Sequence, residues 1–126
     1  MVTEYRVLVV DDEDDSLEIM RSLLKGTGCR VTTAHTGAEA LRALETEKFD
    51  FLIADMVMTG LNGIELLREV RRRGNNTRFI MVTAYGEMES YIEVMNLGAV
   101  EYLSKPVNQN NLAQVMDKAI KAGGAT

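Results

Sequence analysis

Short, continuous apolar runs separated by helix-like stretches constrain the fold of this chain more than any other feature of its sequence. Three runs, at 7–10, 51–54 and 79–82, are apolar at every position, and weaker β-prone segments lie at 29–34 and 99–103. Short runs without alternation are typical of strands that are buried on both faces of a parallel sheet. The pattern therefore predicts five strands in a sheet that is covered on both sides.

Stretches with helical spacing follow each of these strands. The first is expected at about 14–25, ending at Gly26 and Gly28, and the fourth ends at Gly98; Thr36, Asn62 and Asn108 can cap the second, third and fifth. The inward faces expected for the five helices are, in order, Leu17, Met20, Leu23 and Leu24; Ala40, Leu41 and Leu44; Leu66, Leu67 and Val70; Met88, Tyr91, Ile92 and Met95; and Leu112, Val115, Met116, Ala119 and Ile120. Strand and helix thus alternate five times, which predicts a three-layer α/β domain with right-handed crossovers.

Length and composition agree with one globular domain. The 126 residues include 46% hydrophobic and 26% charged residues, and the net charge is −5. The net negative charge argues against direct binding of nucleic acid or of an anionic membrane. A single cysteine, Cys29, excludes an internal disulfide and favours a cytoplasmic location. We expect residues 1–122 to form the domain and 123–126 to be a tail or the start of a linker.

The residues that follow the strands carry the candidate chemistry. The first strand is followed by five acids at 11–15, the third by Asp55, the fourth by Thr83, and the fifth by Lys105 and Pro106. Ligands of open α/β sheets bind beyond the carboxyl ends of the strands. These carboxylates, the hydroxyl and the ammonium group are therefore expected at one rim.

Asp11, Asp12 and Asp55 form the most informative group. Two carboxylates at ~4 Å repel each other by about 1–4 kcal/mol, so the group is unfavourable unless a cation or a proton neutralises it. Mg²⁺ prefers such oxygen ligands and can then hold phosphoryl oxygens. A solvated acidic helix start is the alternative for this run, and we prefer that alternative for Asp14 and Asp15.

Asp55, Lys105 and Thr83 have the right chemistry for phosphoryl transfer. A carboxylate held at a strand end can attack phosphorus and form an acyl phosphate, although a turn-forming role is the alternative for Asp55. The Lys105 ammonium can pair with carboxylates or phosphoryl oxygens, against the alternative of an ordinary surface lysine. The Thr83 hydroxyl can bind a phosphoryl oxygen, but taken alone a β-branched strand residue is the better interpretation.

Together these residues resemble the receiver domains of bacterial two-component response regulators, the family that includes CheY. The resemblance covers nearly the whole chain and implies the flavodoxin-like strand order 2-1-3-4-5. It rests on several motifs in the same order: the acid pair Asp11-Asp12, the segment 54–58 around Asp55, Gly63, Thr83-Ala84, Gly98-Ala99 and the segment 102–106 that ends in Lys105-Pro106.

The resemblance implies a metal-dependent phosphoacceptor. Mg²⁺, for which Mn²⁺ can substitute, is expected on Asp12, Asp55 and the backbone carbonyl of Val57, and through water on Asp11. A histidine kinase or a histidine phosphotransfer protein is expected to donate the phosphoryl group to Asp55. The domain then catalyses only its own phosphorylation and slow dephosphorylation, and is not otherwise an enzyme.

The resemblance also implies a conformational switch. Lys105 and Thr83 bind the phosphoryl oxygens, Thr83 moves inward, and Tyr102 fills the vacated space. The face of the fourth helix, fifth strand and fifth helix then changes, and binds a downstream effector domain or protein or a second copy of the chain. Added charge biasing a bistable element is a general means of switching. The Lys105–Pro106 bond is expected to be cis.

Two departures from the family pattern stand out. Thr59 replaces the usual proline after the methionine, so the loop 59–63 is expected to be more mobile. Val57 and Tyr85 occupy positions that tune the access of water to the acyl phosphate. An apolar Val57 with a bulky Tyr85 predicts slow self-dephosphorylation.

Other interpretations are weaker. A flavin or nucleotide site needs a phosphate-cradling loop after the first strand, where this chain has five acids. A phosphatase needs a second acid or base near Asp55, and a receiver-like scaffold that works without phosphorylation does not need the complete set of site residues. His35 is expected away from the acidic rim in a surface or loop-packing role, and Cys29 as a small buried hydrophobe.

Overall fold

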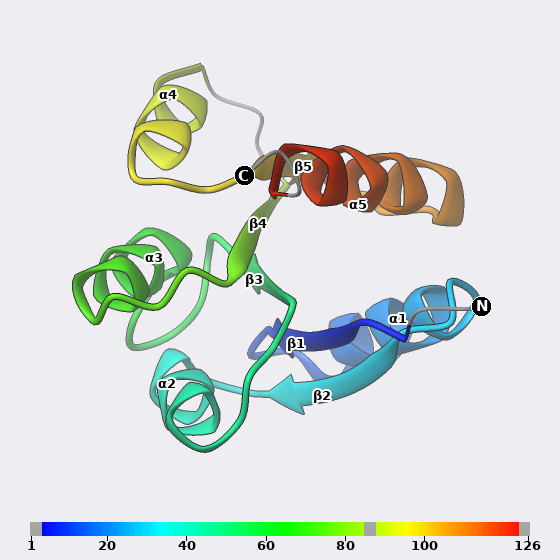
Figure 1. Cartoon of the computed structure of the whole chain (residues 1–126), viewed down its shortest axis with the longest axis horizontal. Coiled ribbons are helices and arrows are strands. Elements are labelled where there is room, and N and C mark those ends of the chain that lie inside the picture. Colours follow the sequence, from blue (N-terminus) through cyan, green and yellow to red (C-terminus); the bar gives the residue numbers. More distant parts are fainter. Residues whose placement is uncertain (1–3, 85–87, 124–126) are drawn as a thin grey trace.

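The computed structural model of the chain describes residues 4–84 and 88–123. Its sheet is entirely parallel, with the strand order β2-β1-β3-β4-β5, so the expected α/β fold is confirmed (Figure 1). The elements are β1 (Arg6–Val10), α1 (Asp14–Lys25), β2 (Arg30–Ala34), α2 (Gly37–Thr46), β3 (Phe51–Asp55), α3 (Gly63–Arg72), β4 (Arg78–Thr83), α4 (Met88–Asn96), β5 (Glu101–Ser104) and α5 (Gln109–Gly123).

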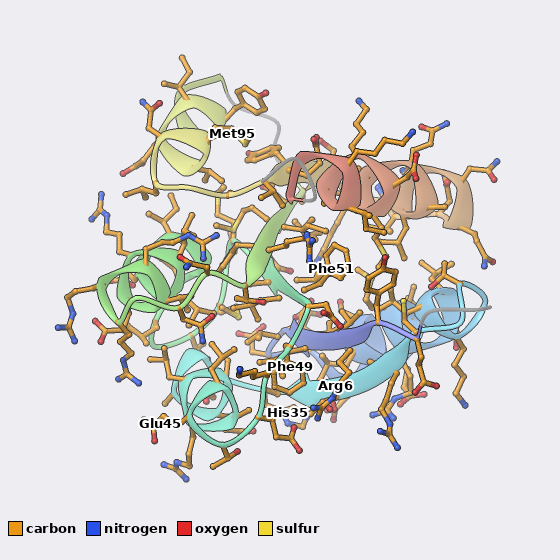
Figure 2. The ribbon with its side chains drawn as sticks, viewed as in Figure 1. Arg6, His35, Glu45, Phe49, Phe51 and Met95 are labelled. Carbon is orange, nitrogen blue, oxygen red and sulfur yellow. The ribbon has the colours of Figure 1, made fainter. Side chains whose placement is uncertain are left out.

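Helices cover both faces of the sheet, with α2, α3 and α4 on one face and α1 and α5 on the other (Figure 1). Successive residues of a strand point to opposite faces. Leu52 of β3 therefore packs with the α2–α4 layer, while its neighbours Phe51 (labelled in Figure 2) and Ile53 pack with the α1–α5 layer. Both layers bury the strand residues that face them, which explains why the three runs are apolar at every position.

The helix ends follow the predicted local signals. The Thr36 side chain accepts the Glu39 N–H at the start of α2, and Asn62 forms a capping box with Glu65 at the start of α3. Asn108 and Asn111 exchange the same kind of hydrogen bonds at the start of α5. Gly26 caps α1, and Gly28 and Gly98 adopt φ of +80° and +102° after α1 and α4, a conformation that favours glycine.

The predicted inward face of α4 is wrong for Tyr91 and Ile92 and right for Met95, which packs against the core. Tyr91 and Ile92 are 43% and 52% exposed, whereas Val94 is fully buried and Met95 is half-buried. Four apolar residues within five positions, 91 to 95, span an arc of about 160° of the helix, which is wider than the stripe that a surface helix needs to bury, so their spacing alone does not select which edge of the arc faces the sheet. The sheet selects the side that carries Val94. The side chain of Met88 lies outside the described residues.

The three arginines that end α3 are used within the fold. Arg71 is half-buried and donates to the carbonyls of Asn75 and Gly98, and burial lowers the pKa of Arg71. Arg72 and Arg73 both pair with Glu69. These charges are thus neutralised or hydrogen-bonded.

In the described part of the chain, no helix has the length and apolar character needed to cross a membrane.

Candidate functional site at the carboxyl ends of the strands

The sheet register brings the predicted site residues to one rim. Val10 pairs with Ala54, so Asp11 and Asp55 are the next residues on neighbouring strands. Thr83 pairs with Ser104, which directly precedes Lys105. A pocket of about 430 Å³ beside this rim is lined by Asp11, Asp55 and Lys105 together with apolar residues of α1 and of the β5–α5 loop.

Lys105 bridges two acids of the rim. Its ammonium nitrogen Nζ lies 2.5 Å from Oδ2 of Asp55 and 3.7 Å from Oδ2 of Asp11. Its backbone N–H donates to the carbonyl of Thr83 at 2.7 Å, which continues the β4–β5 pairing beyond Ser104. The peptide bond between Lys105 and Pro106 is cis, as expected. The lysine therefore serves as the counter-charge of an otherwise acidic rim.

Burial makes the negative charges of this cluster costly in free energy. Asp11 and Asp55 are only 6% and 7% exposed. Burial raises the pKa of Asp11 to about 6, the Glu13 N–H opposes that rise, and the negative charge of Asp55 adds to it. Burial alone would lower the pKa of Lys105, but the hydrogen bond and charge of Asp55, with Asp11, outweigh burial and raise it. One ammonium group thus leaves the acids incompletely neutralised.

Backbone N–H groups orient the three carboxylates of the rim. Each carboxylate accepts one such bond: Asp11 from Glu13 at 3.0 Å, Asp55 from Val57 at 2.9 Å and Asp12 from Thr59 at 2.9 Å. The first two bonds come from the residue two positions later, a local turn that aspartate commonly makes. The third crosses from the β3–α3 loop to the β1–α1 loop.

The donor set suits a hard divalent cation. Carboxylate oxygens of Asp11, Asp12 and Glu13 lie within 4.8 Å of one another, and Lys105 contacts both Asp11 and Asp55. All of these donors are oxygens, several carry negative charge, and the pKa of Asp11 indicates that this charge is costly when it is uncompensated. These are properties of a Mg²⁺ site. The sequence predicts no role for Glu13 by itself, and its place within the acidic run at 11–15 is the signal that points to it.

Gly63 fits tightly beneath Asp55. Its N–H donates to the carbonyl of Met56 at 2.9 Å. A Cβ at position 63 would lie 2.7 Å from the backbone oxygen of Asp55 and 2.8 Å from Cα of Met56, which is too close for any side chain. Glycine at this position therefore lets the start of α3 approach the end of β3 and fixes the backbone of Asp55.

Thr83 and Tyr102 lie on neighbouring strands. Thr83 is fully buried at the end of β4, and Tyr102 is half-buried on β5. The Tyr102 ring contacts the Tyr91 ring of α4 edge to face, with centroids 5.5 Å apart. This contact links β5 to the partly exposed surface of α4.

Val57 is 65% exposed, and Tyr85 lies outside the described residues.

His35 lies at the acidic rim, which corrects the expectation that it would be remote. Its Nε2 is 2.7 Å from Oδ1 of Asp14, and its Nδ1 is 4.0 Å from Oε2 of Glu39. Because β2 is the neighbour of β1, and the Asp11 N–H donates to the carbonyl of Ala34, the turns after the two strands meet. His35 (labelled in Figure 2) therefore pairs with the first turn of α1.

The fold and the rim together define a class of protein: a flavodoxin-like α/β domain in which buried aspartates and a lysine meet beyond the sheet. Residues 7–117 match the family described as the response regulator receiver domain. The chain belongs to this family.

Named relatives and solved structures agree. The chain is 33% identical to the transcriptional regulatory protein ZraR of Escherichia coli (strain K12) over 114 residues, which are 90% of this chain but only 26% of that protein. A receiver domain protein of Clostridium thermocellum superposes with a TM-score of 0.86 at 34% identity, covering 95% of this chain and 97% of the other. The chemotaxis protein CheY4 of Vibrio cholerae superposes with a TM-score of 0.87 at 29% identity, covering 93% of this chain and 99% of the other.

Proposed function

We propose that this receiver domain accepts a phosphoryl group on Asp55 in a Mg²⁺-dependent reaction. The observation that carries the proposal is the contact of the Lys105 ammonium with Oδ2 of Asp55, beside the buried carboxylate of Asp11. A buried acid that is held in place by a cation and by a backbone N–H is a positioned nucleophile. The domain acts on itself and turns over no other substrate.

The proposed donor is a phosphohistidine of a histidine kinase or of a histidine phosphotransfer protein. A carboxylate oxygen of Asp55 attacks the phosphorus, the phosphorus–nitrogen bond breaks, and an acyl phosphate forms. The bonding electron pair stays on the departing imidazole, which takes up a proton from solvent. The later loss of the phosphoryl group to water restores the carboxylate.

Asp11, Asp12 and Asp55, with the backbone carbonyl of Val57, are the proposed ligands of Mg²⁺ or Mn²⁺. The bound cation would neutralise carboxylate charge and hold a phosphoryl oxygen. Asp55 is oriented by the Val57 N–H and by Lys105. Lys105 and the hydroxyl of the buried Thr83 are the proposed partners of the other phosphoryl oxygens.

The proposed switch runs from Thr83 to the surface of α4, β5 and α5. Thr83 moves towards the phosphoryl group, and Tyr102 fills the vacated space. The Tyr102 ring contacts Tyr91, so its movement would change a surface that also exposes Ile92. This surface is the proposed binding site for an effector domain or protein, or for a second copy of the chain. Relatives named as transcriptional regulators, ZraR and NtrC, favour a transcriptional output.

Intact mass measurement after incubation with Mg²⁺ and acetyl phosphate tests the proposal. We expect the wild-type chain to gain one phosphoryl group, and the Asp55→Asn variant to gain none. Asp117→Asn, at an exposed position on α5, is the matched control and should behave as wild type. No gain in the wild-type chain would instead favour a receiver-like scaffold that works without phosphorylation.

A further inference from the structure

The carboxylate of Asp12 is bound by an amide from a distant part of the chain. The N–H of Thr59 donates to Oδ2 of Asp12 at 2.9 Å, across 47 positions of sequence. Asp11 and Asp55, in contrast, accept N–H groups from residues two positions later. The orientation of Asp12 therefore depends on the β3–α3 loop, whereas the other two acids are oriented by their own turns.

The donor is a backbone group, and its presence depends on the residue type at position 59. The proline that is usual here in the family has no N–H, so it cannot make this bond. Threonine supplies the N–H, while its side chain is exposed. Gly60 follows with φ of +75°, which turns the chain immediately after the donor. The departure at position 59 thus adds a contact as well as removing a rigid ring.

We propose that the Thr59 N–H is a positioning donor for Mg²⁺ binding through Asp12, an inference that rests on the proposed function. A hydrogen bond to a carboxylate is stronger than one between neutral groups. This bond holds Oδ2 of Asp12 and leaves Oδ1 available to a cation. Partners that orient ligand side chains raise metal affinity because less order has to be imposed on binding.

The charge of the rim gives the bond a second effect. Oxygens of Asp12 lie within 4.8 Å of those of Asp11 and Glu13, so the metal-free carboxylate is repelled by its neighbours. The hydrogen bond from the Thr59 N–H opposes that repulsion. It also connects the metal site to the loop that leads into α3, so Mg²⁺ binding should change the environment of the Thr59 amide.

Calorimetric titration of the whole chain with Mg²⁺ tests the inference with three variants at position 59. Thr59→Ala and Thr59→Gly keep the N–H, and we expect their dissociation constants to stay within about twofold of wild type. Thr59→Pro removes it, and the dissociation constant should rise by about three- to tenfold, as expected for the loss of one hydrogen bond. In acetyl phosphate assays the half-saturating Mg²⁺ concentration should rise by the same factor, with the rate at saturating Mg²⁺ retained.

The variants also separate the N–H from loop stiffness. If stiffness set the affinity, glycine would weaken Mg²⁺ binding and proline would not, which would overturn the inference. Should Thr59→Pro not fold, the amide signal of Thr59 in ¹H–¹⁵N spectra gives a second test. Its amide should shift on Mg²⁺ addition in the wild type, and its hydrogen exchange in metal-free Asp12→Ala should be faster. An unmoved signal and unchanged exchange would refute the inference.

The wild-type titration distinguishes failure of this inference from failure of the proposed function. If the wild-type chain binds no Mg²⁺, the proposed metal-dependent function fails, and the inference falls with it. If the wild type binds Mg²⁺ and Thr59→Pro binds it equally well, the metal site stands and only the role of Thr59 is overturned.

Discussion

Lys105 Nζ contacts Asp55 Oδ2 at 2.5 Å, although 50 positions separate the two residues. The contact exists because β3 and β5 lie on either side of β4, and their carboxyl ends open onto the same rim. The lysine is three-tenths exposed, and the aspartate is almost fully buried. A cation that reaches from the surface to a buried carboxylate is well placed to follow that carboxylate when its charge changes.

Replacement of Lys105 should slow phosphorylation. In Lys105→Met the apolar stem is kept and the charge is lost, so one group that stabilises the transferred phosphoryl is missing. We expect the rate at saturating Mg²⁺ to fall by about a hundredfold or more, the typical cost of removing one such group. A time course of intact mass with acetyl phosphate measures this rate. Lys121→Met, at an exposed position on α5, should keep the wild-type rate; equal rates in the two variants would contradict the role of Lys105.

The metal-free protein should lose stability as the pH rises from about 4 to about 6. Burial, opposed by the Glu13 N–H and reinforced by Asp55, raises the pKa of Asp11 from 3.8 to about 6. Between these pH values the folded chain binds the Asp11 proton more tightly than the unfolded chain does. The contribution of this proton to the free energy of unfolding is therefore fully present below about pH 4 and is lost as the pH rises to about 6. Two pKa units correspond to about 3 kcal/mol. Urea unfolding in a chelator at several pH values measures the loss.

The Asp11→Asn variant isolates this contribution. It should lack the loss between about pH 4 and 6 and should be more stable than wild type at pH 7 without metal. Glu69 contributes with the opposite sign at lower pH, because hydrogen bonds from Arg72 and Arg73 hold its pKa at about 2. That contribution is common to both proteins and cancels in the difference. A pH dependence identical in the two proteins would disprove the assignment to Asp11.

Gly63→Ala should disturb both stability and the site. The added Cβ would meet the backbone oxygen of Asp55 at 2.7 Å, and we expect a loss of about 1–3 kcal/mol, the usual cost of overpacking. The Asp55 backbone must shift, so phosphorylation should also slow. Gly28→Ala is the control, because its φ of +80° costs stability but nothing lies within 4 Å of the new Cβ. Urea unfolding and the mass assay together separate the two variants, and a Gly63→Ala rate equal to that of Gly28→Ala would contradict the steric role.

Local signals and strand-end residues could be predicted from the sequence, because each depends on a short segment or on the parallel order of the sheet. Asn62 caps α3 through its own neighbours, and Asp11 and Asp55 meet because they follow adjacent strands. Contacts between the loops at the rim could not be predicted in this way. His35 meets Asp14 only because the turns after β1 and β2 come together in the fold, and the Thr59–Asp12 bond has no signal in either segment alone.

The lifetime of the phosphorylated state should depend on Val57 and Tyr85. Val57 follows Asp55 by two residues and exposes an apolar side chain at the rim, where it can exclude water from an acyl phosphate. Replacing both residues with small polar ones, as in Val57→Asn with Tyr85→Ser, should raise the decay rate by about three- to tenfold, or about 0.7–1.4 kcal/mol in the barrier. A time course of intact mass after the donor is removed measures the decay as the loss of the phosphoryl group. Arg42→Gln changes an exposed side chain on α2, outside the proposed switch surface, and should leave the decay unchanged. If the double variant decays no faster than this control, water reaches the acyl phosphate by a route that these two side chains do not cover.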